Sequence, residues 1–95
     1  MVEPLKSWRH LFSAVLALST DGGTVERRLE AAFTGNLQKI VPDRDLPHHL
    51  REDFAKLMHE LTDLFGDGNK HNDSRRASLL AKKVVALYDR VTKEL

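Results

Sequence analysis

The 95-residue chain contains no cysteine, and aromatic residues make up only 6% of it. The absence of cysteine excludes disulfides, thiolate zinc sites, iron–sulfur ligation through cysteine and cysteine-nucleophile chemistry. The chain also lacks a strong excess of either charge, because 15 Lys and Arg residues face 14 Asp and Glu residues and the formal net charge is +1. This balance argues against a strongly basic nucleic-acid binder and against an acidic tail protein.

Long hydrophobic runs are also missing, since no stretch approaches the roughly 18–20 apolar residues of a membrane span. The longest apolar-rich run extends from Leu11 to Leu18, and Ser13 interrupts it. Its apolar residues recur at helical spacing, and no small-residue cleavage site follows before Thr20, so we do not interpret it as a signal peptide. We therefore expect no membrane contact and a soluble, cytoplasmic protein in a reducing compartment.

Four segments of the chain carry apolar residues with a period near 3.6, which is the period of an amphipathic helix. No segment alternates polar and apolar residues as a strand does. Turn signals separate the four segments at 21–23, 41–45 and 66–73. We predict a single all-α domain over residues 1–95, a compact four-helix bundle that is either up-down-up-down or an orthogonal variant, because short connections make successive helices antiparallel.

The ends of these segments carry residues typical of helix termini. Pro4 is tolerated in a first turn, and Thr24 is a good N-cap for the second helix, which we expect to continue until Pro42 ends it. The third helix follows 45–47, with Asp45 or the next residue as its cap. We expect Gly66 to end it in a left-handed conformation.

The first helix has more apolar perimeter than one internal core needs, and Leu79 and Val85 fall off the main stripe of the last helix. Leftover apolar surface on a small domain often marks a partner interface, and the alternative is a wide helix in a well-covered core. We predict a small protein-interaction module that binds a protein partner or forms a homodimer. Its expected anchors are Trp8, Leu11 and Phe12.

A second candidate surface is basic. Residues 41–65 have a net charge of −3 and residues 66–95 a net charge of +3, so the predicted third and fourth helices are oppositely charged. The cations at the start of the fourth helix are Arg75, Arg76, Lys82 and Lys83. They form either a surface that contacts phosphate or a partner, or a solvated face that pairs with the acidic third helix. No interleaved aromatic residues offer a stacking platform for single strands.

The segment from Arg44 to His49 has Arg-x4-His spacing. This spacing resembles the Arg-x4-6-His motif of HEPN-type ribonucleases, which are also small helical bundles. The resemblance implies that Arg44 would stabilise phosphate charge and that His49 would act in acid–base transfer. The match covers six residues, and Pro47 lies inside it, whereas the family carries the motif on a helix and its following turn. A nucleic-acid-acting protein, either a basic-face binder or such a ribonuclease, is the alternative function.

The sequence contains no complete metal-binding or catalytic motif. No two of the five histidines have the i,i+3 or i,i+4 spacing that puts two ligands on one helix face, although His49 with Asp53 and His59 with Asp63 combine two ligand types at that spacing. The segment 67–73 lacks the residues of a calcium loop at its fifth and sixth positions. We therefore assign no catalytic residue, metal or cofactor, and favour a protein that is not an enzyme.

Overall fold

The computed structural model describes residues 4–20, 23–66 and 74–95, and every regular element in these ranges is a helix. The elements, in chain order, are α1 (Pro4–Thr20), α2 (Val25–Gly35), the 3-10 helix η1 (Leu37–Lys39), α3 (Pro42–Asp45), α4 (His48–Phe65) and α5 (Ser74–Lys93). The prediction of an all-α protein is confirmed. No helix among the described residues combines the length and apolarity needed to span a bilayer.

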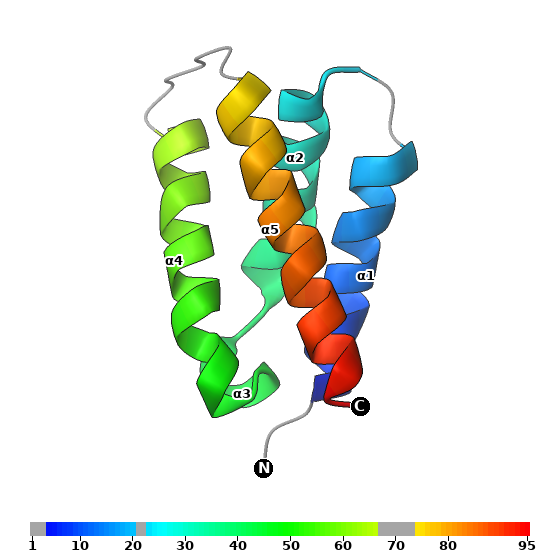
Figure 1. Ribbon diagram of the computed structural model, residues 1–95, viewed down its shortest axis with the longest axis vertical. Helices are drawn as coiled ribbons and strands as arrows, with labels where there is room; N and C mark the ends of the chain where they lie inside the picture. The colour runs from blue at the N-terminus through cyan, green and yellow to red at the C-terminus, as the bar shows by residue number, and fades with distance from the viewer. Residues whose placement is uncertain (1–3, 21–22, 67–73) are drawn as a thin grey trace.

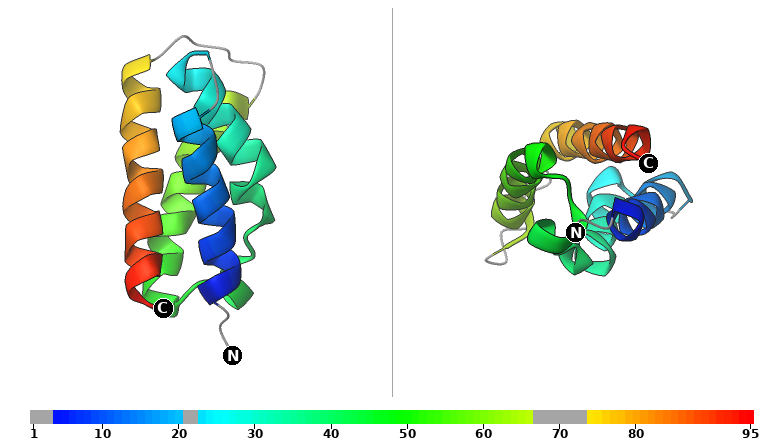
Figure 2. Two further views of the ribbon diagram at one scale, coloured as in Figure 1. Left: turned by 90° about the vertical axis from the view of Figure 1, so that its right-hand side faces the viewer. Right: turned by 90° about the horizontal axis from the view of Figure 1, so that it is seen from below.

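The four long helices lie side by side and alternate in direction (Figure 1). α1 and α4 run from one end of the molecule to the other, and α2 and α5 run back, so α1 begins at the end where α5 finishes (Figure 1). α5 packs against α1, α2 and α4, and Figure 2 shows it between α4 and α1 when the molecule is viewed from below. η1 and α3 connect α2 with α4, and α3 packs against both α1 and α4.

Several predicted helix ends are confirmed. α1 begins at Pro4, and Thr24 is the N-cap of α2, where its hydroxyl oxygen accepts a hydrogen bond from the Arg27 backbone N–H at 3.2 Å. Gly66 follows the last residue of α4 as predicted. Its backbone is extended, with φ −76° and ψ 168°, so the predicted left-handed conformation is wrong.

The predicted second helix is too long, and the predicted turn at 41–45 contains a helix. α2 ends at Gly35, with Asn36 as its C-cap. Glycine and asparagine are poor residues for a helix interior, which explains why the chain leaves the α conformation there. Pro42 then begins α3, because its fixed φ and missing N–H suit a first helical turn.

Asp45 forms hydrogen bonds at the start of its own helix, α3. The prediction that Asp45 or the next residue caps α4 is wrong. The Asp45 side chain is fully buried, and Oδ2 accepts a hydrogen bond from the Val41 N–H at 2.9 Å. The Arg44 Nε donates to the other oxygen at 3.0 Å. Burial acts to raise the pKa of Asp45, but the bonds from Arg44 and Val41 outweigh it and hold the pKa below its ordinary value. The N-cap position of α4 is occupied by Pro47.

Arg51 on α4 binds the other end of α3. Its Nε donates to the Pro42 and Leu46 carbonyl oxygens, and one terminal nitrogen donates to the Asp43 carbonyl oxygen, each at 3.0 Å. The Pro42 carbonyl also accepts the Leu46 N–H, so Arg51 adds a second donor there, and it supplies a donor to the Asp43 and Leu46 carbonyls at the end of this short helix. α3 is therefore anchored to α4 by one side chain.

Buried side chains from α1, α2, η1, α4 and α5 form one apolar core, together with Ile40 and Leu46, which flank α3. The largest of those with less than 2% of their surface exposed are Leu11, Leu29, Leu37, Leu46, Leu50, Leu61, Leu80, Val84 and Val91. Leu11 is thus a core residue of α1 and does not reach the surface on which we expected it to act as a partner anchor. Phe12, its neighbour in sequence, is 40% exposed.

Candidate interaction surface

Three aromatic side chains cluster where α1 meets α5. The Trp8 and Phe12 rings stack with centroids 5.2 Å apart and planes inclined by 7°. The Tyr88 ring lies 5.9 Å from Trp8 and 6.2 Å from Phe12. The indole N–H of Trp8 donates to the Thr92 hydroxyl oxygen at 2.9 Å. Stacked and tilted rings at these separations attract one another beyond their burial, so the cluster joins two helices that are distant in sequence.

Exposed apolar side chains extend from this cluster along both helices. Leu5 is 50% exposed and Leu16 43% exposed on α1, and Val85 is 45% exposed on α5. On α1, positions 5, 8, 12 and 16 follow helical spacing and share a side of the helix, as do positions 81, 85, 88 and 92 on α5. We call this surface the α1–α5 face and define it by Leu5, Trp8, Phe12, Leu16, Val85 and Tyr88.

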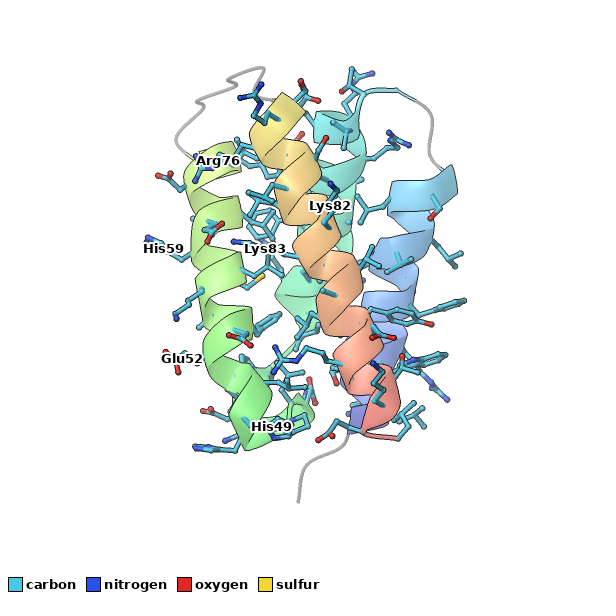
Figure 3. All side chains as sticks on the ribbon, viewed as in Figure 1. His49, Glu52, His59, Arg76, Lys82 and Lys83 are labelled. Carbon is cyan, nitrogen blue, oxygen red and sulfur yellow. The ribbon has the colours of Figure 1, made fainter. Side chains whose placement is uncertain are left out.

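The basic residues of α5 divide into two groups. Arg76 and Lys83 point toward α4 (Figure 3), where Arg76 pairs with Asp63 at 2.9 Å and Lys83 pairs with Glu60 at 3.2 Å. Arg75 and Lys82 are exposed, and Lys82 points away from α4 (Figure 3). The interpretation in which the basic helix pairs with the acidic helix is therefore confirmed for two of the four cations.

A third ion pair, between Arg90 and Asp53, continues the row between α5 and α4. The hydrogen bond from Arg90 is the main cause that holds the pKa of Asp53 below its ordinary value. The cations at 76, 83 and 90 are seven residues apart, so they lie along one side of α5. Opposite charges thus line the contact between the two helices.

A groove of about 250 Å³ lies between α4 and α5. Its lining residues are Asp53, Lys56, Leu57, Glu60, Lys83, Ala86, Leu87 and Arg90. The lining contains both members of two ion pairs, so its charges largely neutralise one another. The groove has no set of convergent groups that favours one class of ligand.

Arg44 and His49 have separate carboxylate partners. The Arg44 side chain is 55% exposed and pairs with Asp45, whereas His49 Nε2 lies 3.1 Å from an oxygen of Glu94. His49 is in the first turn of α4, at the end of the molecule where α5 finishes (Figure 3). The HEPN-like interpretation requires both side chains to face one phosphate, whereas each is paired here with a carboxylate from a different segment.

Neither His49 with Asp53 nor His59 with Asp63 is joined by a third metal ligand among the described residues. The carboxylates of Asp53 and Asp63 are paired with arginines of α5. Within 4–20, 23–66 and 74–95, no three His, Asp or Glu side chains are grouped as metal ligands would be. The segment 67–73 that we compared with a calcium loop lies outside the described residues.

Sequence reasoning placed Val85 of the last helix in the leftover apolar surface but named anchor residues only on the first helix. The structure places Tyr88 of α5 half-buried beside Trp8 and Phe12. The available signal was the position of Val85, which falls off the main stripe on the same side as Tyr88.

The chain matches no protein-family model, no curated protein and no solved structure.

Proposed function

We propose that this protein is a helical protein-interaction module and that the α1–α5 face is its docking surface. The observation that carries the proposal is the group of apolar side chains exposed by 40–50% in and beside the aromatic cluster, on both helices. They are Leu5, Phe12 and Leu16 of α1 and Val85 of α5. Removing apolar surface from water contributes roughly 25 cal/mol per Å² to association. A group of this kind gains free energy when a second apolar surface covers it, whereas isolated exposed leucines need no partner.

The aromatic cluster supplies rigid anchors for such a partner. Trp8 is held by stacking on Phe12 and by its hydrogen bond to Thr92, and Tyr88 supports both rings from α5. Side chains that are already ordered lose little conformational entropy when they bind. Tryptophan and tyrosine are also enriched among residues that dominate binding energy in protein interfaces.

We also propose that the scaffold of this face is an up-down-up-down four-helix bundle formed by α1, α2, α4 and α5. The alternating helix directions and the shared apolar core support this description. A bundle holds α1 and α5 in fixed register, so the face is preformed. The proposal places the module in a reducing cytoplasm, which a chain without cysteine tolerates.

The nucleic-acid alternative has less support from the side-chain geometry. Phosphate would have to displace Asp63 from Arg76 and Glu60 from Lys83 before it reached these two cations. Of the four cations predicted at the start of α5, this leaves the exposed Arg75 and Lys82. Two cations are too few for the multiple phosphate contacts of a typical nucleic-acid binder. No observation favours this function over protein binding.

Site-specific photocrosslinking in the native cell tests the proposed function. A benzoyl-phenylalanine in place of Phe12 keeps an aromatic ring at the centre of the α1–α5 face. The matched control carries it in place of Glu30, an exposed position of α2. We expect a defined polypeptide adduct from position 12 and none from position 30. The absence of any polypeptide adduct at position 12, or the same adducts at both positions, would overturn the proposal.

A further inference from the structure

We infer that the partner of the α1–α5 face is an amphipathic helix whose apolar stripe is flanked by Asp and Glu side chains. This inference rests on the proposed function and adds the chemistry of the partner. Its starting observation is the charge that surrounds the face. Three exposed cations border the apolar side chains, and every side-chain carboxylate on α1, on α5 and in the residues after α5 is already paired.

The bordering cations are Arg9 on α1 and Arg75 and Lys82 on α5, and all three are exposed. Arg9 lies three residues before Phe12, so helical spacing places it beside the exposed apolar side chains of α1. Lys82 lies three residues before Val85 and points away from α4 (Figure 3). None of the three pairs with a carboxylate in the part of the chain that the structure describes. They are therefore available to a partner.

Side-chain carboxylates are scarce beside this face. On α1, on α5 and in the residues after α5 they are Asp89 and Glu94. Asp89 pairs with Lys93 of its own helix at 3.1 Å, and Glu94 lies 3.1 Å from His49 of α4. The face thus has a local excess of positive charge. A second copy would bring the same excess to it, because a two-fold interface uses the same patch twice, whereas an acidic partner would offset it.

The shape of the face suits a helix better than a membrane surface. Its apolar side chains lie on two adjacent helices, and α1 with its 17 residues spans about 25 Å. A partner helix laid along both buries its apolar stripe and places acids over Arg9 at one edge and Lys82 at the other. Insertion into lipid buries projecting apolar side chains. Trp8, by contrast, is half-buried, stacks on Phe12 and donates its N–H to Thr92.

Isothermal titration calorimetry with three synthetic peptides tests this inference. Each peptide is an amphipathic helix of about 18 residues, which is long enough to span α1. The three share one leucine stripe and carry Glu, Gln or Lys at the positions that flank it. We expect the wild-type chain to bind the acidic peptide about tenfold more tightly than the neutral one, and the basic peptide most weakly. Added salt should reduce these differences, because the flanking pairs are exposed.

Charge reversal of the face provides the matched variant. Arg9→Glu combined with Lys82→Glu should weaken binding of the acidic peptide and strengthen binding of the basic one, so that their order reverses. The control combines Arg27→Glu with Lys39→Glu, which makes the same charge change at exposed positions of α2 and η1, and it should leave the order unchanged. All four residues are exposed, so both double variants should keep the fold, which circular dichroism checks.

Equal affinity for the three peptides would overturn the inference, as would no binding of the acidic peptide up to about 1 mM. So would a preference for acid that survives in the variant with Arg9→Glu and Lys82→Glu. Binding to vesicles of equal parts phosphatidylserine and phosphatidylcholine that the acidic peptide does not displace would replace the helix by an anionic membrane. A polypeptide adduct at position 12, seen together with equal peptide affinities, would reject the acidic partner and keep the docking surface.

Discussion

Leu11 and Phe12 are neighbours in sequence with different surroundings. Leu11 has no exposed surface, whereas Phe12 is 40% exposed. Successive side chains on a helix are separated by a rotation of about 100°, so one residue points into the core while the next lies at its edge. The sequence predicts that both residues belong to a wide apolar stripe. It does not show where that stripe leaves the core, because this depends on how closely α5 approaches α1.

Alanine substitutions at these two positions should separate their roles. Leu11→Ala leaves a cavity in the core and should lower the free energy of unfolding by about 2–5 kcal/mol. Phe12→Ala should lower it by about 1 kcal/mol, because the ring loses only its stacking and partial burial. Urea denaturation monitored by circular dichroism measures both. Equal losses at the two positions would show that Phe12 is a core residue and would argue against its place in a docking face.

Asp45 should link stability to acidic pH. Its carboxylate accepts hydrogen bonds from Val41 and Arg44, and an Asn side chain keeps only one oxygen to accept them. We expect Asp45→Asn to cost about 1–3 kcal/mol at pH 7. Because the folded pKa lies below the ordinary value of 3.8, this stabilisation is present above that value and is lost as the pH falls through the folded pKa. The difference between wild type and variant should therefore shrink on acidification.

The control for this pH series is Asp43→Asn, an exposed carboxyl in the same short helix. It should change the free energy of unfolding by no more than about 0.5 kcal/mol. Urea denaturation at several pH values between about 3 and 7 brackets the ordinary carboxyl pKa. A constant difference between wild type and Asp45→Asn across that range would show that the buried carboxylate does not titrate as proposed.

At the scale of elements, local signals predicted the helix ends that depend on local chemistry. Pro4 and Thr24 mark helix starts because a missing N–H and a side-chain acceptor suit the first turn wherever it lies. The connection from α2 to α4 was predicted poorly. Its geometry depends on Asp45 bonding backward to Val41 and on Arg51 reaching three carbonyls, and a hydrophobic pattern contains no trace of either contact.

Arg51→Met should loosen α3 selectively. The methionine keeps an apolar stem of similar length but removes the donors to Pro42, Asp43 and Leu46. We expect a loss of about 1–2 kcal/mol in the free energy of unfolding. Faster amide hydrogen exchange should appear at Leu46, whose N–H donates to the Pro42 carbonyl at 3.1 Å. Arg27→Met, at an exposed position of α2, is the control, and equal exchange rates in both variants would contradict the anchoring role of Arg51.

At the scale of the whole molecule, the net charge of +1 conceals an internal division of charge. The regional charges predicted that an acidic and a basic helix are neighbours, and the structure pairs them side chain by side chain. The contact of Trp8 with Thr92 was beyond prediction, because it joins residues 84 positions apart and requires α1 and α5 to meet in one register. The α1–α5 face depends on that register. The sequence indicated surplus apolar residues on both helices, and the fold brings the two helices together.

The row of ion pairs between α4 and α5 leads to a prediction about the assembly of the molecule. One variant replaces the three cations Arg76, Lys83 and Arg90 with Glu, which places negative charges opposite the three acids of α4. A second variant replaces these acids, Asp63, Glu60 and Asp53, with Lys, which places positive charges opposite the cations of α5. Each reversal alone should lower the melting temperature. Together they restore every pair and the original net charge, so the combined variant should return to near the wild-type value.

Each single-helix variant also moves the net charge further from zero, to −5 or +7, so self-repulsion needs its own control. Reversing three exposed cations outside the row, Arg27, Lys39 and Lys82, to Glu gives the same net charge of −5 and should lower the melting temperature less. Thermal unfolding followed by circular dichroism measures the three variants and wild type in low salt, where surface pairs are least screened. Raising the salt to about 1 M should bring all four melting temperatures closer together, because the Debye length then falls to about 3 Å. A combined variant no more stable than its parents would mean that α4 and α5 do not meet along this row of charges.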